Sequence, residues 1–225
     1  MLFALGQPAA FAGLLIGFVL ALLLRAVAIR LMGKWAGLTD RHDSVRPRLR
    51  EDVDAFGAVA AAVGGAGWGK IIDVDEVPRW RGRGRAALVF AAGPIFTIVA
   101  AQVVFLAFRL FYGYDDAAFS FLSPSDVLRG QFEATFDVQL LLSIAVGLLG
   151  FGLLSLLPIP PLDGFGLLWS AQRNPGRGMQ GYRLWFQEKN LGVVVLLVCC
   201  FFPLSYPLLL VPIDLLGGIF MQIWG

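Results

Sequence analysis

The chain has 225 residues, of which 58% are hydrophobic and only 15% are charged, and its mean hydropathy is +0.75. Soluble domains carry about 25% charged residues, so this composition excludes an ordinary soluble protein and indicates an integral membrane protein. A net charge of +2 is too small to favour nucleic acid as a partner. At about 20 residues per crossing, the length predicts a single all-α membrane domain over residues 1–225, with roughly four to six membrane helices.

Three apolar segments are long enough to cross a membrane, and they lie at residues 8–30, 86–111 and 138–157. A fourth, 55–69, is short and consists mostly of Ala and Gly, which favours a re-entrant or interfacial hairpin. Residues 190–225 are apolar but contain three prolines. One kinked span and a pair of short helices are both consistent with that pattern.

The positive charges are concentrated in the polar segments. Eleven of the 18 Lys and Arg residues lie between residues 30 and 85, whereas residues 112–137 contain one. The positive-inside rule therefore predicts that 32–85 and 171–189 face the cytoplasm of a bacterial inner membrane, and that 112–137 faces the outside. Arginines at alternate positions from 79 to 85 are expected to contact lipid headgroups.

Cysteine and histidine are scarce. Cys199 and Cys200 are neighbours in an apolar run, so we expect small buried hydrophobic residues rather than a redox pair. The single histidine, His42, lies in a polar loop between Arg41 and Asp43, where it is expected to be solvated. One imidazole is too few for a zinc site that uses two histidines.

A proline-rich stretch follows the third apolar segment and reads SLLPIPPLDG from Ser155 to Gly164. Proline has no N–H to donate and clashes with the preceding turn, so these prolines predict an extended backbone after the helix. Asp163 comes directly after them. An ionisable residue at membrane depth indicates a functional site, although an interfacial loop with a water-facing aspartate is equally consistent.

With these segments in order, the chain resembles the site-2 protease family of intramembrane zinc metalloproteases over roughly residues 10–215. In that family one helix carries HExxH and a later one carries NxxPxPxLDG, whose Asp completes the zinc site. The stretch from Ser155 matches the second motif except that Ser replaces Asn. The sequence GWGK at 67–70 is similar to the family's Gly-Trp-Ala-Lys hairpin, and AGPIFT at 92–97 to its Ala-Gly-Pro-x-x-Asn helix, with a helix break expected at the Gly-Pro pair. The resemblance implies these structural or partner-groove residues: Trp68, Lys70, Gly93, Pro94, Thr97, Ser155, Pro158, Pro160 and Pro161.

The first family motif is missing. In the best alignment Ala21 and Arg25 occupy the two histidine positions and Leu22 the glutamate position, and residues 1–39 contain no His, Glu or Asp. A catalytic zinc of this type needs three protein ligands and an open position for water, and a general base to activate that water. We therefore expect no metal, no cofactor and no hydrolytic activity, with Ala21, Leu22, Arg25 and Asp163 as the remnant of the family's site.

Arg25 is the residue expected to replace the metal. A guanidinium can neutralise a buried carboxylate through two parallel hydrogen bonds, so we predict an Arg25–Asp163 pair. Lys70 is the competing partner for Asp163. In the rival interpretation Arg25 extends to the membrane surface and Asp163 faces water.

These features favour a non-catalytic, protease-like membrane protein that serves as an accessory, scaffold or assembly subunit of a larger membrane complex. Its expected partners are other membrane proteins and lipids, with no nucleic acid. One alternative is an active metalloprotease with an atypical site. A small transporter is the other alternative, and the lack of an internal repeat in the sequence argues against it. Small residues in the spans would permit either partner docking or close internal packing: Gly13, Gly17, Ala21, Gly147, Gly150 and Gly152.

Overall fold

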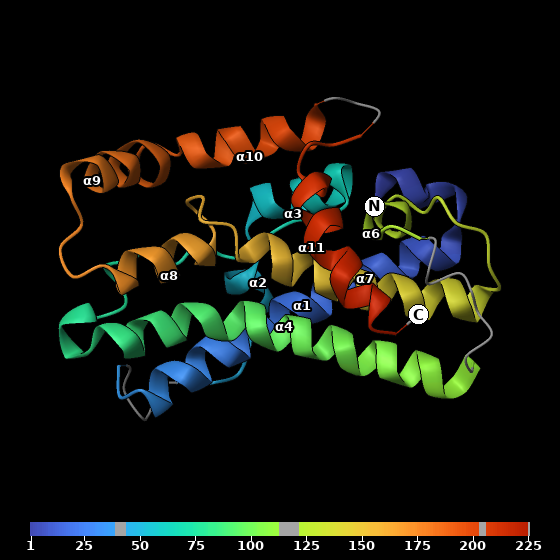
Figure 1. Ribbon diagram of the computed structural model, residues 1–225, viewed down its shortest axis with the longest axis horizontal. Helices are drawn as coiled ribbons and strands as arrows, with labels where there is room; N and C mark the ends of the chain where they lie inside the picture. The colour runs from blue at the N-terminus through green and yellow to red at the C-terminus, as the bar shows by residue number, and fades with distance from the viewer. Residues whose placement is uncertain (39–43, 113–121, 203–205, 225) are drawn as a thin grey trace.

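The structure is a computed structural model, and it describes residues 1–38, 44–112, 122–202 and 206–224 (Figure 1). His42 and its neighbours Arg41 and Asp43 lie outside the described residues. Within the described part, every element is helical apart from one isolated antiparallel bridge. The predicted all-α architecture is therefore confirmed.

Three described helices are long and apolar enough to cross a membrane: α1 (Pro8–Trp35), α4 (Arg83–Tyr112) and α7 (Phe136–Ser155). A fourth crossing is possible in length and composition if Arg177–Glu188 and Leu191–Phe201 are taken together, although the two are bent by 68°. The described chain thus forms a polytopic membrane protein, and it reaches the predicted four to six membrane helices only if the bent pair counts as one span.

The helix break expected at Gly93 and Pro94 is wrong, because α4 continues through both residues without interruption. In a membrane-spanning helix, neighbouring helices and hydroxyl side chains accommodate the backbone around a proline. Here the Thr97 hydroxyl donates to the carbonyl oxygens of Pro94 (2.8 Å) and Gly93 (3.2 Å). The proline is consequently part of one long helix that packs along the whole bundle (Figure 1).

The hairpin predicted for the Ala- and Gly-rich segment is confirmed. Asp54 caps the helix α3 (Ala55–Gly64) by accepting a 2.7 Å hydrogen bond from the backbone N–H of Gly57. Gly65, with a φ of +84°, ends the helix, and the chain returns so that Gly69 bridges to Val53. This return places Gly69 beside Leu22 and Arg25 of α1.

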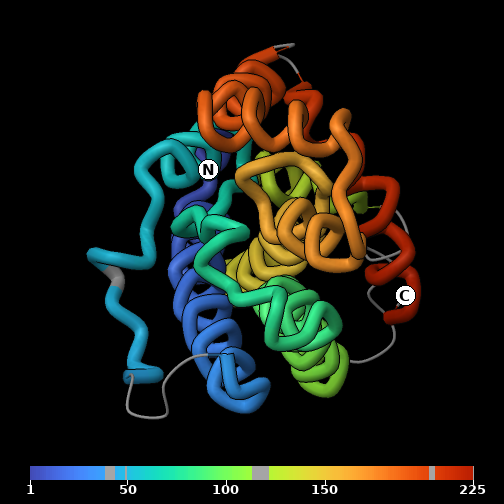
Figure 2. Tube along the Cα trace, turned by 90° about the vertical axis from the view of Figure 1, so that its left-hand side faces the viewer, coloured from blue at the N-terminus to red at the C-terminus, as the bar shows by residue number. Residues whose placement is uncertain are grey.

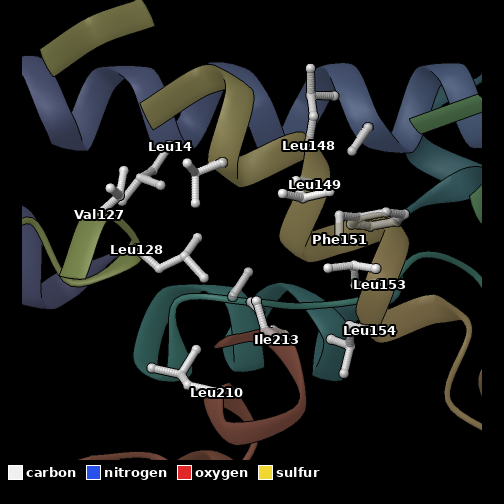
Figure 3. Packing of buried hydrophobic residues seen from close by; sticks show 14 of the residues in the cluster. Leu14, Val127, Leu128, Leu148, Leu149, Phe151, Leu153, Leu154, Leu210 and Ile213 are labelled. Atoms are coloured by element: carbon white, nitrogen blue, oxygen red, sulfur yellow. The ribbon is translucent and has the colours of Figure 1, made fainter. Parts of the chain in front are cut away.

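α7 is the central helix of the bundle, and 13 of its 20 residues are buried. It packs against both α1 and α4, which also contact each other (Figures 1 and 2). Leucines and a phenylalanine along α7 point into the main core, where they meet residues from α1, the short helix α6 (Pro124–Leu128) and the C-terminal helix (Figure 3).

The glycines between α1 and α7 serve internal packing. A Cβ atom at Gly13 would lie 2.5 Å from the carbonyl oxygen of Leu140, and one at Gly17 would lie 3.0 Å from that of Ile144. Backbone therefore approaches backbone directly at this interface, as small residues allow. Of the two roles considered for these residues, the structure shows internal packing.

The C-terminal region consists of two separate short helices, α10 (Leu191–Phe201) and α11 (Leu210–Gln222). Of the two alternatives for this region, the structure therefore shows the pair of short helices and not one kinked span. α10 lies over α3, whereas α11 packs against α6 and α7 (Figure 1). Cys200 is buried and Cys199 is half-buried, and both are free thiols. The remaining short elements are η1 (Leu2–Gly6), α2 (Leu49–Asp52), η2 (Arg79–Arg81), α8 (Asp163–Ala171), α9 (Arg177–Arg183) and η3 (Leu184–Glu188).

Candidate functional site

The proline-rich stretch connects the central helix to α8. α7 ends at Ser155, and the next helix begins at Asp163. Pro160 and Pro161 are buried, whereas Pro158 is exposed. Asp163 is the first residue of α8, where unpaired backbone N–H groups and the helix dipole favour a negative charge. The prolines therefore end one helix and place a carboxylate at the start of the next.

Arg25 reaches this carboxylate from α1. Its Nε donates to Asp163 Oδ2 at 2.6 Å, and its Nη2 donates to Asp163 Oδ1 at 2.5 Å. Only 8% of the Arg25 side chain and 2% of the Asp163 side chain are exposed. The predicted pair is confirmed, and the rival interpretation, with Arg25 at the membrane surface and Asp163 in water, is wrong.

Two glycines leave the space that the Arg25 side chain and its partner carboxylate occupy. A Cβ atom at Gly93 of α4 would lie 2.7 Å from Arg25 Cγ and 3.5 Å from Asp163 Oδ2. One at Gly69 would lie 3.0 Å from Arg25 Nη1 and 2.9 Å from Leu22 Cδ2. Gly93 was marked by the resemblance, but the role of Gly69 was not predicted. The pair is thus enclosed by α1, α4, α8 and the returning arm of the hairpin.

The residues at this site do not fit a catalytic zinc ion. Ala21 and Leu22, at a histidine and the glutamate position of the resemblance, are buried and carry no donor atom. Both oxygens of the Asp163 carboxylate accept hydrogen bonds from Arg25. Across the part of the chain that the structure describes, no three His, Cys, Asp or Glu side chains come close enough to hold a metal. A zinc site with three protein ligands cannot be assembled from these groups.

Lys70 is not the partner of Asp163, so that alternative is wrong. Its side chain is exposed and makes no ion pair with any described residue. Trp68 is 2% exposed and belongs to the main core, and its indole Nε1 has no hydrogen-bond partner among the described residues. Thr97 and Ser155 are also buried. The burial of these last three residues fits the structural one of the two roles predicted for them.

A second ion pair lies one to two turns further along α1, and it was not predicted. Arg30 Nη2 donates to Asp52 Oδ1 at 2.5 Å, and the backbone N–H of Arg48 donates to Asp52 Oδ2 at 2.7 Å. Arg30 Nη1 also donates to the carbonyl oxygen of Arg46 at 2.8 Å. Asp52 is 8% exposed, so it fixes the polar segment 44–54 against the end of α1.

Comparison with known proteins finds a relative in Bacillus subtilis (strain 168) that bears the name "Putative zinc metalloprotease YwhC". The two are 28% identical over 116 residues, which cover 52% of this chain and 48% of the relative. The chain therefore spans about half the length of the relative that it matches. No family model and no solved structure matches the chain. The match supports a protease-like relationship over half of the sequence.

Proposed function

We propose that this chain is a non-catalytic, protease-like membrane protein that acts by binding other membrane proteins, as an accessory, scaffold or assembly subunit of a larger complex. The observation that carries the proposal is the buried Arg25–Asp163 pair. In the family that the chain resembles, the aspartate at the position of Asp163 binds the metal, and the residue at the position of Arg25 is a second metal ligand. In this chain the two side chains neutralise each other.

The arginine performs the electrostatic task of a divalent cation. A lone charge at membrane depth costs at least a few kcal/mol, so a carboxylate there needs a positive partner. A guanidinium meets that need with two charge-assisted hydrogen bonds of fixed geometry. A metal could reach Asp163 only by displacing Arg25, which would leave a buried arginine without its acceptor. The pair therefore keeps the site closed.

An outward face of α4 is available to a partner helix. Val99, Val103, Leu106 and Leu110 recur at helical spacing and are 43–76% exposed. The glycines of α1 and α7, by contrast, are used within the bundle. A subunit role would bring a partner helix to this face of α4, in place of lipid.

An atypical metalloprotease is the second candidate, and the name of the Bacillus relative favours it. Metal content separates the two candidates. We expect the purified wild-type chain to contain far less than one zinc per chain and to leave membrane-protein substrates uncleaved. A stoichiometric zinc ion that is lost in Asp163→Ala would establish the metalloprotease and overturn the proposal.

Rebuilding the missing motif supplies the matched control. The triple variant Ala21→His, Leu22→Glu and Arg25→His restores the spacing of two imidazoles one helical turn apart. Together with Asp163 these groups provide three zinc ligands and a general base. We expect about one zinc per chain in the triple variant and none after the further change Asp163→Ala. A triple variant that folds and binds no zinc would contradict the placement of the remnant site.

The subunit role has its own test. A photo-crosslinking residue at Val103, on the exposed face of α4, is expected to give one discrete adduct in the native membrane. The same residue at Val194 of α10, which is 52% exposed, serves as the control position and is expected to give none. A chain that purifies alone as a monomer from mild detergent, without an adduct at either position, would argue against a subunit.

A further inference from the structure

A cavity of about 210 Å³ lies beside the buried ion pair, between the last turns of α1, the first turns of α4 and the segment 52–78. Its apolar wall includes Ala26, Ile29, Ile72 and Val89. Its polar lining consists of five charged side chains: Arg25, Arg30, Asp52, Lys70 and Glu76. The cavity therefore joins an apolar surface to a charged one, as a site for an amphiphilic molecule does.

The cationic side chains in this lining carry more N–H donors than the neighbouring acceptors use. Asp52 is already held by Arg30 and by a backbone N–H. Arg25 uses Nε and Nη2 for Asp163, whereas its Nη1 has no acceptor among the described residues. The Lys70 ammonium likewise has no ion-pair partner in the described part of the chain. Glu76 is exposed and, unlike Asp52, has no cationic partner among the described residues, so its carboxylate would repel an anion.

The cavity lies at the basic end of the bundle. Arg81 donates to the carbonyl oxygen of Gly37 at 3.2 Å, and Arg85 donates to that of Ala36 at 3.5 Å. These contacts bring the arginine run of residues 79–85 to the end of α1, which the charge distribution predicts to face the cytoplasm. Basic pockets between membrane helices on that side are typical sites for anionic lipid headgroups.

We propose that this cavity binds the phosphate of an anionic phospholipid. Lys70 and Arg25 Nη1 are the donors to the phosphate, and the wall formed by Ile29, Ile72 and Val89 contacts the first part of an acyl chain. The volume is below the roughly 300–1,000 Å³ of a pocket that encloses a whole small molecule, so the rest of the lipid remains in the bilayer. The proposal goes beyond the subunit role and does not depend on it.

Lipid titration of the full chain in a neutral detergent tests the site. Phosphatidylglycerol is expected to bind and to raise the unfolding temperature, whereas phosphatidylcholine, with the same acyl chains, is expected to have little effect. Lys70→Gln should weaken phosphatidylglycerol binding about fivefold, since one basic residue near an anionic surface contributes about that factor. Glu76→Gln should strengthen it, because a repelling carboxylate is removed.

Two further variants establish the location. Lys189→Gln is the matched control, because Lys189 is an exposed lysine outside the cavity, over the ring of Trp185. It should leave the affinity unchanged. Ile72→Trp keeps every charge and fills the cavity, so it should abolish the preference for phosphatidylglycerol. Circular dichroism and elution volume confirm that each variant is folded.

Three outcomes would overturn the proposal. Equal binding of phosphatidylglycerol to Lys70→Gln and wild type would place the lipid elsewhere. Equal effects of phosphatidylglycerol and phosphatidylcholine would remove the role of the anion. Inorganic phosphate that stabilises the chain as much as the lipid does would identify a site for a free anion instead of a lipid headgroup.

Discussion

Two arginine–carboxylate sites among the described residues, those of Arg25 and Arg183, differ in burial more than in geometry. At the first, Arg25 makes two hydrogen bonds to one carboxylate, and both side chains are nearly inaccessible. At the second, Arg183 Nη2 lies 2.5 Å from Asp75, 3.6 Å from Asp73 and 3.8 Å from Glu188. The three acidic side chains of this second site are 46–70% exposed.

The second site has more partners, yet we expect it to matter less. Water solvates exposed carboxylates whether or not an arginine is near, so exposed pairs contribute at most about 1 kcal/mol. A buried carboxylate that loses its arginine has no water to replace it. The comparison teaches that the energetic role of an arginine depends on the accessibility of its partners rather than on their number.

Removing Arg25 should give the largest effect. Arg25→Met leaves Asp163 buried without a positive partner, and we expect a loss of about 3–5 kcal/mol in the free energy of unfolding. Reversible unfolding in mixed micelles measures it. The double variant Arg25→Met with Asp163→Leu removes both charges, and it should recover most of the loss. A double variant as unstable as the single one would show that the pair has a packing role and no electrostatic one.

Crowding the pair should give an intermediate effect. Gly93→Ala places a Cβ atom 2.7 Å from Arg25 Cγ, so the arginine must shift, with an expected loss of about 1–3 kcal/mol. Gly84→Ala is the control on the same helix, because a Cβ atom there meets nothing within 4 Å. The control should be neutral or slightly stabilising, since Ala has the higher helix propensity. Equal losses in the two variants would contradict the close approach at Gly93.

The Arg30–Asp52 pair lies between the two extremes, with side-chain exposures of 27% and 10%. Arg30→Met leaves Asp52 with one remaining backbone hydrogen bond, so we expect a loss of about 1–2 kcal/mol. The same unfolding assay applies. A loss as large as that of Arg25→Met would mean that partial exposure of the carboxylate does not reduce the loss of stability. That result would refute the dependence of the loss on the accessibility of the partner.

The buried pair could be predicted because charges are rare in the apolar segments. Arg25 and Asp163 were the two charges most clearly placed inside the membrane, so each was the natural partner for the other. The Arg30–Asp52 pair could not be predicted, because the polar segment around Asp52 offers many charges and no periodicity to choose among them. Sequence identifies an ion pair where alternatives are few.

The fold shows the same limit. The hairpin could be predicted because its apolar segment is too short to span a membrane and is rich in glycine. The break expected at Pro94 is wrong, because the neighbouring helices accommodate the proline and α4 continues through it. The space that Gly69 leaves for Arg25 depends on how the hairpin returns to α1, and no local pattern encodes that contact.

The smallest effect is expected at the exposed site. Arg183→Met should lower the free energy of unfolding by no more than about 1 kcal/mol despite its three acidic neighbours. Raising the salt concentration from about 0.1 M to 1 M shortens the screening length from about 10 Å to 3 Å. The difference between wild type and Arg183→Met should therefore shrink at high salt, while that for Arg25→Met stays nearly constant. A salt-insensitive loss of several kcal/mol at Arg183 would remove the distinction between the two sites.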